Sequence, residues 1–136
     1  MLYQQLLQLQ AENRPIRIGC HGAGAHCAGP GFVAQVGHVP GMEVAILADA
    51  DVAAGRAAFE LAGIAPELIV ECSAPGPAMD ALLAGRRVVT GDLALPALVE
   101  AIDIVTAARA SPASGAAVAL AGIQNGKDVV LLNVEV

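Results

Sequence analysis

The residues best suited to chemistry lie in a glycine-rich segment near the N-terminus. Residues 18–31 read IGCHGAGAHCAGPG and follow a short apolar run that predicts a strand. A sharp turn from strand to helix, with few Cβ atoms, lets backbone N–H groups approach a diphosphate, and the helix N-terminus adds its positive dipole end. Gly22 and Gly24 satisfy the close backbone approach. The segment therefore predicts a dinucleotide-binding turn.

The third glycine of the Gly-x-Gly-x-x-Gly pattern has two candidates. At the usual spacing the position falls on Cys27, and with two inserted residues it falls on Gly29. We favour Gly29, because Pro30 would then stand in the first helical turn, where proline is preferred. The candidate cofactor-binding residues of this turn are Gly22, Ala23, Gly24, Ala25, Cys27 and Gly29.

An acidic residue follows the second apolar run. Asp49 comes directly after residues 43–48, EVAILA, and 27 positions after Gly22. A carboxylate at this place hydrogen-bonds the hydroxyls of the adenosine ribose. It also repels a 2′-phosphate unless Arg56 compensates. The candidate cofactors are NAD and NADP, and Asp49 favours NAD.

A phosphate-loop nucleoside triphosphatase is excluded by the residues after the glycines. Gly24 and Gly29 enclose four residues, as in that motif, but Pro30 and Gly31 stand where Lys and Ser or Thr are needed.

Two other kinds of site involve the cysteines and histidines of the segment. Cys20, His21, His26 and Cys27 suggest zinc, but six residues separate the two cysteines, and paired zinc ligands usually stand closer. We therefore expect no metal site. A redox thiol at Cys27, activated by the helix N-terminus and by His26, is an alternative use of the same turn.

Continuous Val, Ile and Leu runs alternate with helical segments along the chain, which is typical of a parallel sheet covered on both faces. We predict an α/β, Rossmann-like doubly wound sheet of about five strands, in a single domain over residues 1–136, with a short N-terminal helix at about 2–12. Candidate strands are residues 16–20, 43–48, 68–72, 87–90, 102–107 and 128–132. Candidate helices are residues 32–39, 52–62, 78–83, 93–101 and 112–124, and we expect Asp51 to cap the second of these.

Composition excludes several classes of protein. With Lys+Arg 7 against Asp+Glu 13 the net charge is −6, which argues against a nucleic-acid-binding surface. No apolar stretch is long enough to span a membrane. Three cysteines without a disulfide spacing favour the reducing cytoplasm.

Beyond these patterns, the stretch IRIGCHGAG…FVAQVGHVPGMEVAILADADVAAGRAAF resembles the N-terminal NAD(P)-binding domain of homoserine-dehydrogenase-like oxidoreductases that carry a C-terminal SAF domain. That group includes a deoxyxylulose-phosphate reductoisomerase-like enzyme. The leading helix LYQQLLQLQAENRPIRIG, the middle piece AGRRVVTGD and the tail AVALAGIQNGKDVVLLNVEV resemble it too, so the similarity covers nearly the whole chain.

The resemblance implies hydride transfer between a nicotinamide cofactor and a small carbonyl or hydroxyl substrate. It places Gly22 and Gly24 at the pyrophosphate and Asp49 at the adenosine ribose. It also places Ala108, Arg109 and Asn133 beside the nicotinamide. The chain departs from the family at 107–110, where Ala-Ala-Arg-Ala replaces Glu-Ala-Thr-Gly.

The family's catalytic residues lie beyond position 136, so we expect a chain that binds cofactor without completing catalysis, either as a truncated or engineered fragment or as a diverged stand-alone module. The alternative functions are a non-catalytic nucleotide-sensing or protein-interaction module and a folded domain without a ligand. A domain normally docked on a second one leaves an apolar patch, so we expect a homo-oligomer or a missing C-terminal domain.

Overall fold

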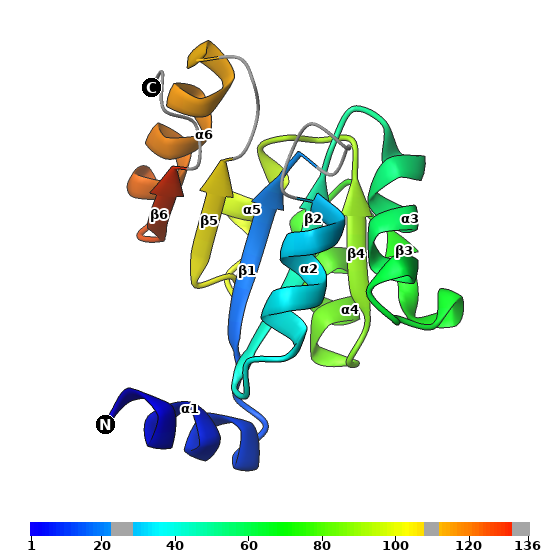
Figure 1. The fold of residues 1–136 in the computed structure, drawn as a ribbon. Coiled ribbons are helices and arrows are strands. Elements are labelled where there is room, and N and C mark those ends of the chain that lie inside the picture. Colours follow the sequence, from blue (N-terminus) through cyan, green and yellow to red (C-terminus); the bar gives the residue numbers. More distant parts are fainter. Residues whose placement is uncertain (23–28, 108–111, 132–136) are drawn as a thin grey trace.

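The computed structural model describes residues 1–22, 29–107 and 112–131. Its strands form one parallel sheet of six, in the order β3-β4-β2-β1-β5-β6 (Figure 1). The strands are β1 (Ile16–His21), β2 (Met42–Ala48), β3 (Ile69–Glu71), β4 (Arg87–Thr90), β5 (Ile104–Ala107) and β6 (Asp128–Leu131). The helices are α1 (Leu2–Ala11), α2 (Gly29–Gly37), α3 (Val52–Leu61), the 3-10 turn η1 (Pro66–Leu68), α4 (Pro75–Leu83), α5 (Leu95–Leu98) and α6 (Pro112–Gln124).

Helices α2 and α3 cover one face of the sheet. Phe59 of α3 is fully buried there and is the largest side chain in the core, among small aliphatic neighbours. Val33 and Val36, one helical turn apart on α2, point into the same cluster. Burying such residues removes apolar surface from water and is the main stabilising contribution to this layer.

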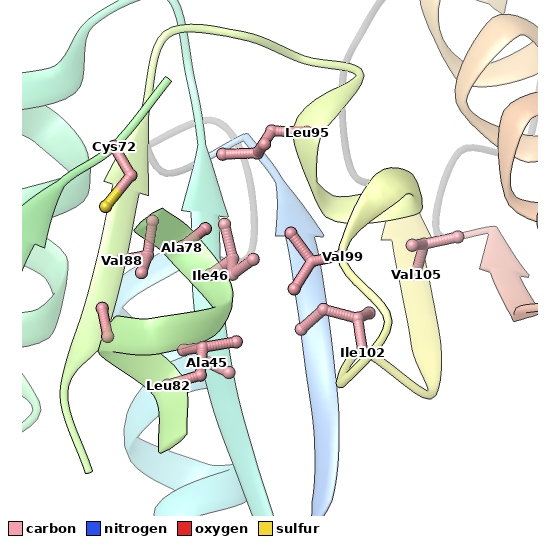
Figure 2. Close-up of a cluster of buried hydrophobic side chains, with 11 residues drawn as sticks. Ala45, Ile46, Cys72, Ala78, Leu82, Val88, Leu95, Val99, Ile102 and Val105 are labelled. Carbon is pink, nitrogen blue, oxygen red and sulfur yellow. The ribbon is translucent and has the colours of Figure 1, made fainter. Parts of the chain in front are cut away.

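Helices α4, α5 and α6 cover the opposite face. Figure 2 shows this second cluster, in which Ile46 and Val88 of the sheet lie near Ala78 and Leu82 of α4 and near Leu95 at the start of α5. Helix α6 approaches β5 and β6 so closely that a Cβ added at Gly122 would lie 2.6 Å from Cγ2 of Val105. Covering both faces makes the sheet doubly wound, as its apolar strands predict.

The sheet has six strands where about five were predicted, and each of the six overlaps one of the candidate strand segments. The segment Arg87–Thr90 is only four residues long, but it lies between β3 and β2 and its last three residues are buried. Residues 93–101 were expected to be helical, yet α5 spans only Leu95–Leu98. The backbone leaves the helical conformation at Val99, where ψ is 120°, and the Nζ of Lys127 donates to the carbonyl oxygens of Val99 (2.9 Å) and Glu100 (3.3 Å) just after the helix.

Burial lowers the pKa of Lys127, and the nearby carboxylates of Asp103 and Glu100 oppose that shift. Two carbonyl oxygens and two nearby carboxylates therefore hold the Lys127 ammonium at the amino-terminal edge of the sheet.

Helix α1 lies at the amino-terminal edge of the sheet, away from the carboxyl ends of the strands (Figure 1). Leu6 is its buried residue, while Leu2 and Tyr3 are 69% and 61% exposed. No helix in the described part of the chain is long and apolar enough to cross a bilayer.

Candidate functional site

The register of the sheet brings the glycine turn and the acidic residue together. In the pairing of β1 with β2, His21 stands opposite Ala48. The N–H of Gly22 then donates to the carbonyl oxygen of Ala48 at 2.9 Å. Because Asp49 directly follows Ala48, Gly22 and Asp49 lie side by side at the carboxyl edge, where ligands bind in open α/β sheets.

Gly22 adopts a backbone conformation that favours glycine. Its φ is +92°, and the residue is buried. A residue with a Cβ is disfavoured at this angle. The first glycine of the predicted turn is therefore required by the path of the chain as it leaves β1.

Helix α2 begins at Gly29 instead of the expected residue 32, and Pro30 is its second residue. That position agrees with the expected place of Pro30 in the first turn. The helix ends at Gly37 instead of residue 39, because Pro40 and Gly41 form the turn into β2. The first N–H groups of an α-helix have no partner within the helix, and an anion can accept hydrogen bonds from them.

Asp49 is held by its own loop. One of its carboxylate oxygens accepts the N–H of Asp51 at 2.9 Å, and its backbone N–H donates to the carbonyl oxygen of Thr90 at 3.0 Å. Asp51 in turn accepts the N–H of Ala54 at 3.2 Å and caps α3, as predicted. The carboxylate of Asp49 is therefore fixed at the end of β2, only partly buried.

The loop after β4 meets the same edge. The hydroxyl of Thr90 accepts the N–H of Asp92, and the Asp92 carboxylate accepts the N–H of Ala94, both at 3.0 Å. In β5 the Thr106 hydroxyl is buried without a hydrogen-bond partner among the described residues. Leaving such a group unpaired costs roughly 1–3 kcal/mol.

His21 was considered in the sequence mainly as a zinc ligand, and the structure gives it different partners. Its side chain is 1% exposed. Nδ1 lies 3.1 Å from the carbonyl oxygen of Thr106, and Nε2 lies 2.5 Å from that of Leu93. The ring thus joins β1 to β5 and to the loop before α5. A histidine that ends an apolar strand was the sequence signal for this role.

The remaining predicted site residues lie outside the described residues and stay predictions. They are Ala23, Gly24, Ala25, Cys27, Ala108, Arg109 and Asn133, together with His26 of the alternative thiol site. Within the described ranges no three His, Cys, Asp or Glu side chains cluster as a metal site would require.

Cys20 and Cys72 are both buried. Burial raises the pKa of Cys72, and the neighbouring Glu71 carboxylate raises it further. Because only the thiolate is a nucleophile, this shift lowers the reactivity of the Cys72 thiol near neutral pH.

A hollow of about 590 Å³ lies at the opposite, amino-terminal edge, between α1 and residues 37–43. Its carboxylate, Glu43, already pairs with Arg17 and Arg87, at 3.2 Å each. The polar groups of Gly22, Asp49 and Thr90 lie instead at the opposite, carboxyl edge.

The fold of this chain is similar to that of two solved structures. The chain is similar to myo-inositol dehydrogenase from Lactobacillus casei, solved in complex with NAD(H) and myo-inositol, with a TM-score of 0.60 and 21% identity over 86% of this chain and 28% of that one. It is also similar to an oxidoreductase domain protein from Kribbella flavida, with a TM-score of 0.56 and 17% identity over 86% of this chain and 26% of that one. The fold is Rossmann-like.

The matched region therefore spans little more than a quarter of either oxidoreductase. No protein-family model and no curated protein matches the sequence.

Proposed function

We propose that this chain is the NAD(P)-binding domain of an oxidoreductase, with NAD favoured over NADP. The observation that carries the proposal is the pairing of Gly22 with Ala48, which places a positive-φ glycine beside Asp49. The start of α2 at Gly29 adds a helix N-terminus after the same turn. Diphosphate and ribose hydroxyls are the groups that such an arrangement binds.

The sequence resemblance supports a finer proposal. In the homoserine-dehydrogenase-like, SAF-containing group, a domain of this kind binds the nicotinamide cofactor, and later residues bind the substrate. We propose that hydride transfer by this chain needs such a second domain, because the cofactor carries the redox chemistry and the protein must still position a substrate against it.

Asp49→Ala is expected to lower the affinity for NAD about tenfold, because the ribose loses a hydrogen bond to a charged group. The same substitution should reduce the difference between the affinities of the chain for NAD and for NADP. The measurement is thermal unfolding with NAD, NADP, ADP-ribose and AMP. For the unsubstituted chain, a ligand at about 100 times its Kd adds about 2.7 kcal/mol to the free energy of unfolding.

Asp51→Ala is the matched control. It removes the cap of α3 and costs about 1 kcal/mol of stability, but it leaves the Asp49 carboxylate in place. Its NAD affinity should equal that of the unsubstituted chain. Equal NAD affinity in Asp49→Ala and Asp51→Ala would exclude the ribose role of Asp49.

A protein-interaction module is the second candidate, and the exposed face of α1 favours it. Leu2, Tyr3 and Leu7 expose apolar surface on a helix that has no charged residue between positions 2 and 11. Light scattering over a range of protein concentrations distinguishes the two candidate functions. A module that self-associates through this face increases its average mass with concentration, and it does so without a nucleotide.

A further inference from the structure

The domain covers only a small part of the apolar surface of α1. Leu6 is the one buried residue of this ten-residue helix, and its backbone lies so close to Gly41 that no Cβ fits between them. Leu2 and Tyr3 remain 69% and 61% exposed at the end of the helix that projects from the amino-terminal edge (Figure 1). A helix of this length is marginal in water unless one of its faces is packed. Further packing on α1 would therefore stabilise it.

The hollow of about 590 Å³ beside α1, which we call the α1 groove, follows the length of the helix. Tyr3, Leu7 and Gln10 stand at positions i, i+4 and i+7, so they share one helix face and form one wall. That wall extends roughly 10 Å at 1.5 Å per residue, and Asn13 continues it beyond the helix. Residues 37–43 form the other wall. An elongated groove with a helical wall suits a second helix.

The α1 groove carries little net charge. Its lining has one carboxylate, that of Glu43, which pairs with Arg17 and Arg87 at 3.2 Å each. Helix α1 has no charged residue between positions 2 and 11, whereas the whole chain has a net charge of −6. Two copies of the chain therefore repel each other over most faces but not at this one. An uncharged amphipathic helix is the partner that fits, and α1 of a second copy is such a helix.

We propose that two copies of the chain pair through the α1 groove, with their α1 helices antiparallel and each helix lying in the groove of the other copy. Because α1 forms one wall of its own groove, a two-fold axis near Leu7 fills both grooves at once, as a symmetric dimer contact requires. Tyr3 of one helix then faces Gln10 of the other, and the phenol O–H can donate to the amide oxygen. The inference rests on the second candidate function, because it names the partner of that α1 face.

Sedimentation equilibrium of the full chain without nucleotide tests the pairing. The average mass of the unsubstituted chain should rise with concentration to that of a dimer. Leu7→Glu should raise the dimer dissociation constant at least about tenfold, because two carboxylates then meet near the axis. Leu7→Lys should do the same. An equal mixture of the Glu and Lys variants should form the dimer that neither variant forms alone.

Two variants of other exposed leucines are the controls. Leu7 is 42% exposed, Leu61 at the end of α3 is 76% exposed, and Leu120 on α6 is 56% exposed. Leu61→Glu and Leu120→Glu should both dimerise like the unsubstituted chain. Far-UV circular dichroism should show the same helix content in all variants. A dimer that Leu120→Glu weakens and Leu7→Glu does not would overturn the proposal and assign the contact to α6.

The direction of the helices is measured by NMR on a mixture of labelled and unlabelled chains. Isotope-filtered spectra should show a contact between the Tyr3 ring of one copy and the Gln10 side chain of the other, which lie too far apart within one helix. Contacts between Tyr3 and Tyr3 of the partner subunit would contradict the antiparallel pair.

The outcomes separate the inference from the function on which it rests. If the chain stays monomeric at every concentration, the proposed pair and self-association through the α1 face both fail. If the mass rises but Leu7→Glu has no effect, the proposed pair alone fails. Neither result depends on NAD, because no nucleotide is present in the experiment.

Discussion

Gly22→Ala should strongly reduce the stabilisation of this chain by NAD. The backbone of Gly22 has a φ of +92°, and an alanine there costs roughly 1–2 kcal/mol in backbone strain. The added methyl group would also stand where the turn must approach the diphosphate. We expect a loss of NAD affinity of at least about tenfold, measured by calorimetric titration.

Gly63→Ala is a control of matched backbone cost. Gly63 follows α3, has a φ of +94°, and an added Cβ would meet nothing within 4 Å. Both variants should therefore lose a similar amount of stability. If Gly63→Ala lowers NAD affinity as much as Gly22→Ala does, the loss reflects general destabilisation and the glycine turn is not the diphosphate site.

Gly41→Ala should detach α1 from the domain. Gly41 has a φ of +76°, and its Cβ would overlap the backbone of Leu6, lying 2.9 Å from the carbonyl carbon and still closer to the carbonyl oxygen. Backbone atoms cannot rotate away as a side chain can, so the helix must move. We expect a loss of about 3 kcal/mol or more of stability, the sum of backbone strain and overpacking.

Urea unfolding measures the decrease in the free energy of unfolding of Gly41→Ala. Limited proteolysis near residues 12–15 shows whether α1 is released. The matched variant is Gly85→Ala, where φ is +80° and an added Cβ meets nothing within 4 Å. It should lose only the strain and keep α1 docked. Equal stability and equal proteolysis of the two variants would contradict the contact between Gly41 and Leu6.

The first half of the chain was predictable from local patterns. The bounds of α1, the run into Asp49 and the cap at Asp51 all depend on neighbouring residues, and the structure confirms them. Apolar strands alternating with helices also predicted the doubly wound sheet, because parallel strands buried on both faces need continuous apolar runs.

Residues 66–83 were harder to predict. The expected strand 68–72 is reduced to Ile69–Glu71, because the 3-10 turn Pro66–Leu68 occupies the residues before it. Helix α4 begins at Pro75 instead of residue 78. Proline is favoured in the first helical turn, so Pro75 and Pro77 were compatible with an earlier start that apolar spacing alone does not indicate.

The role of His21 could not be predicted from spacing. Its two carbonyl partners are 72 and 85 positions away along the chain, and only the parallel register of β1 with β5 brings one of them into reach. The Thr106 hydroxyl has no hydrogen-bond partner among the described residues, and its surroundings likewise depend on what β5 packs against. Long-range contacts of this kind follow from topology and have no local pattern.

The position of the ligand is the central claim, and amide NMR tests it most directly. NAD is titrated into the ¹⁵N-labelled chain, and each backbone signal is followed. We predict the largest shifts at Gly22, at Gly29 and at Asp49, with little change in α1. Shifts concentrated at the amino-terminal hollow around Tyr3 and Val39, or no shifts at saturating NAD, would contradict a dinucleotide site at the carboxyl edge of the sheet.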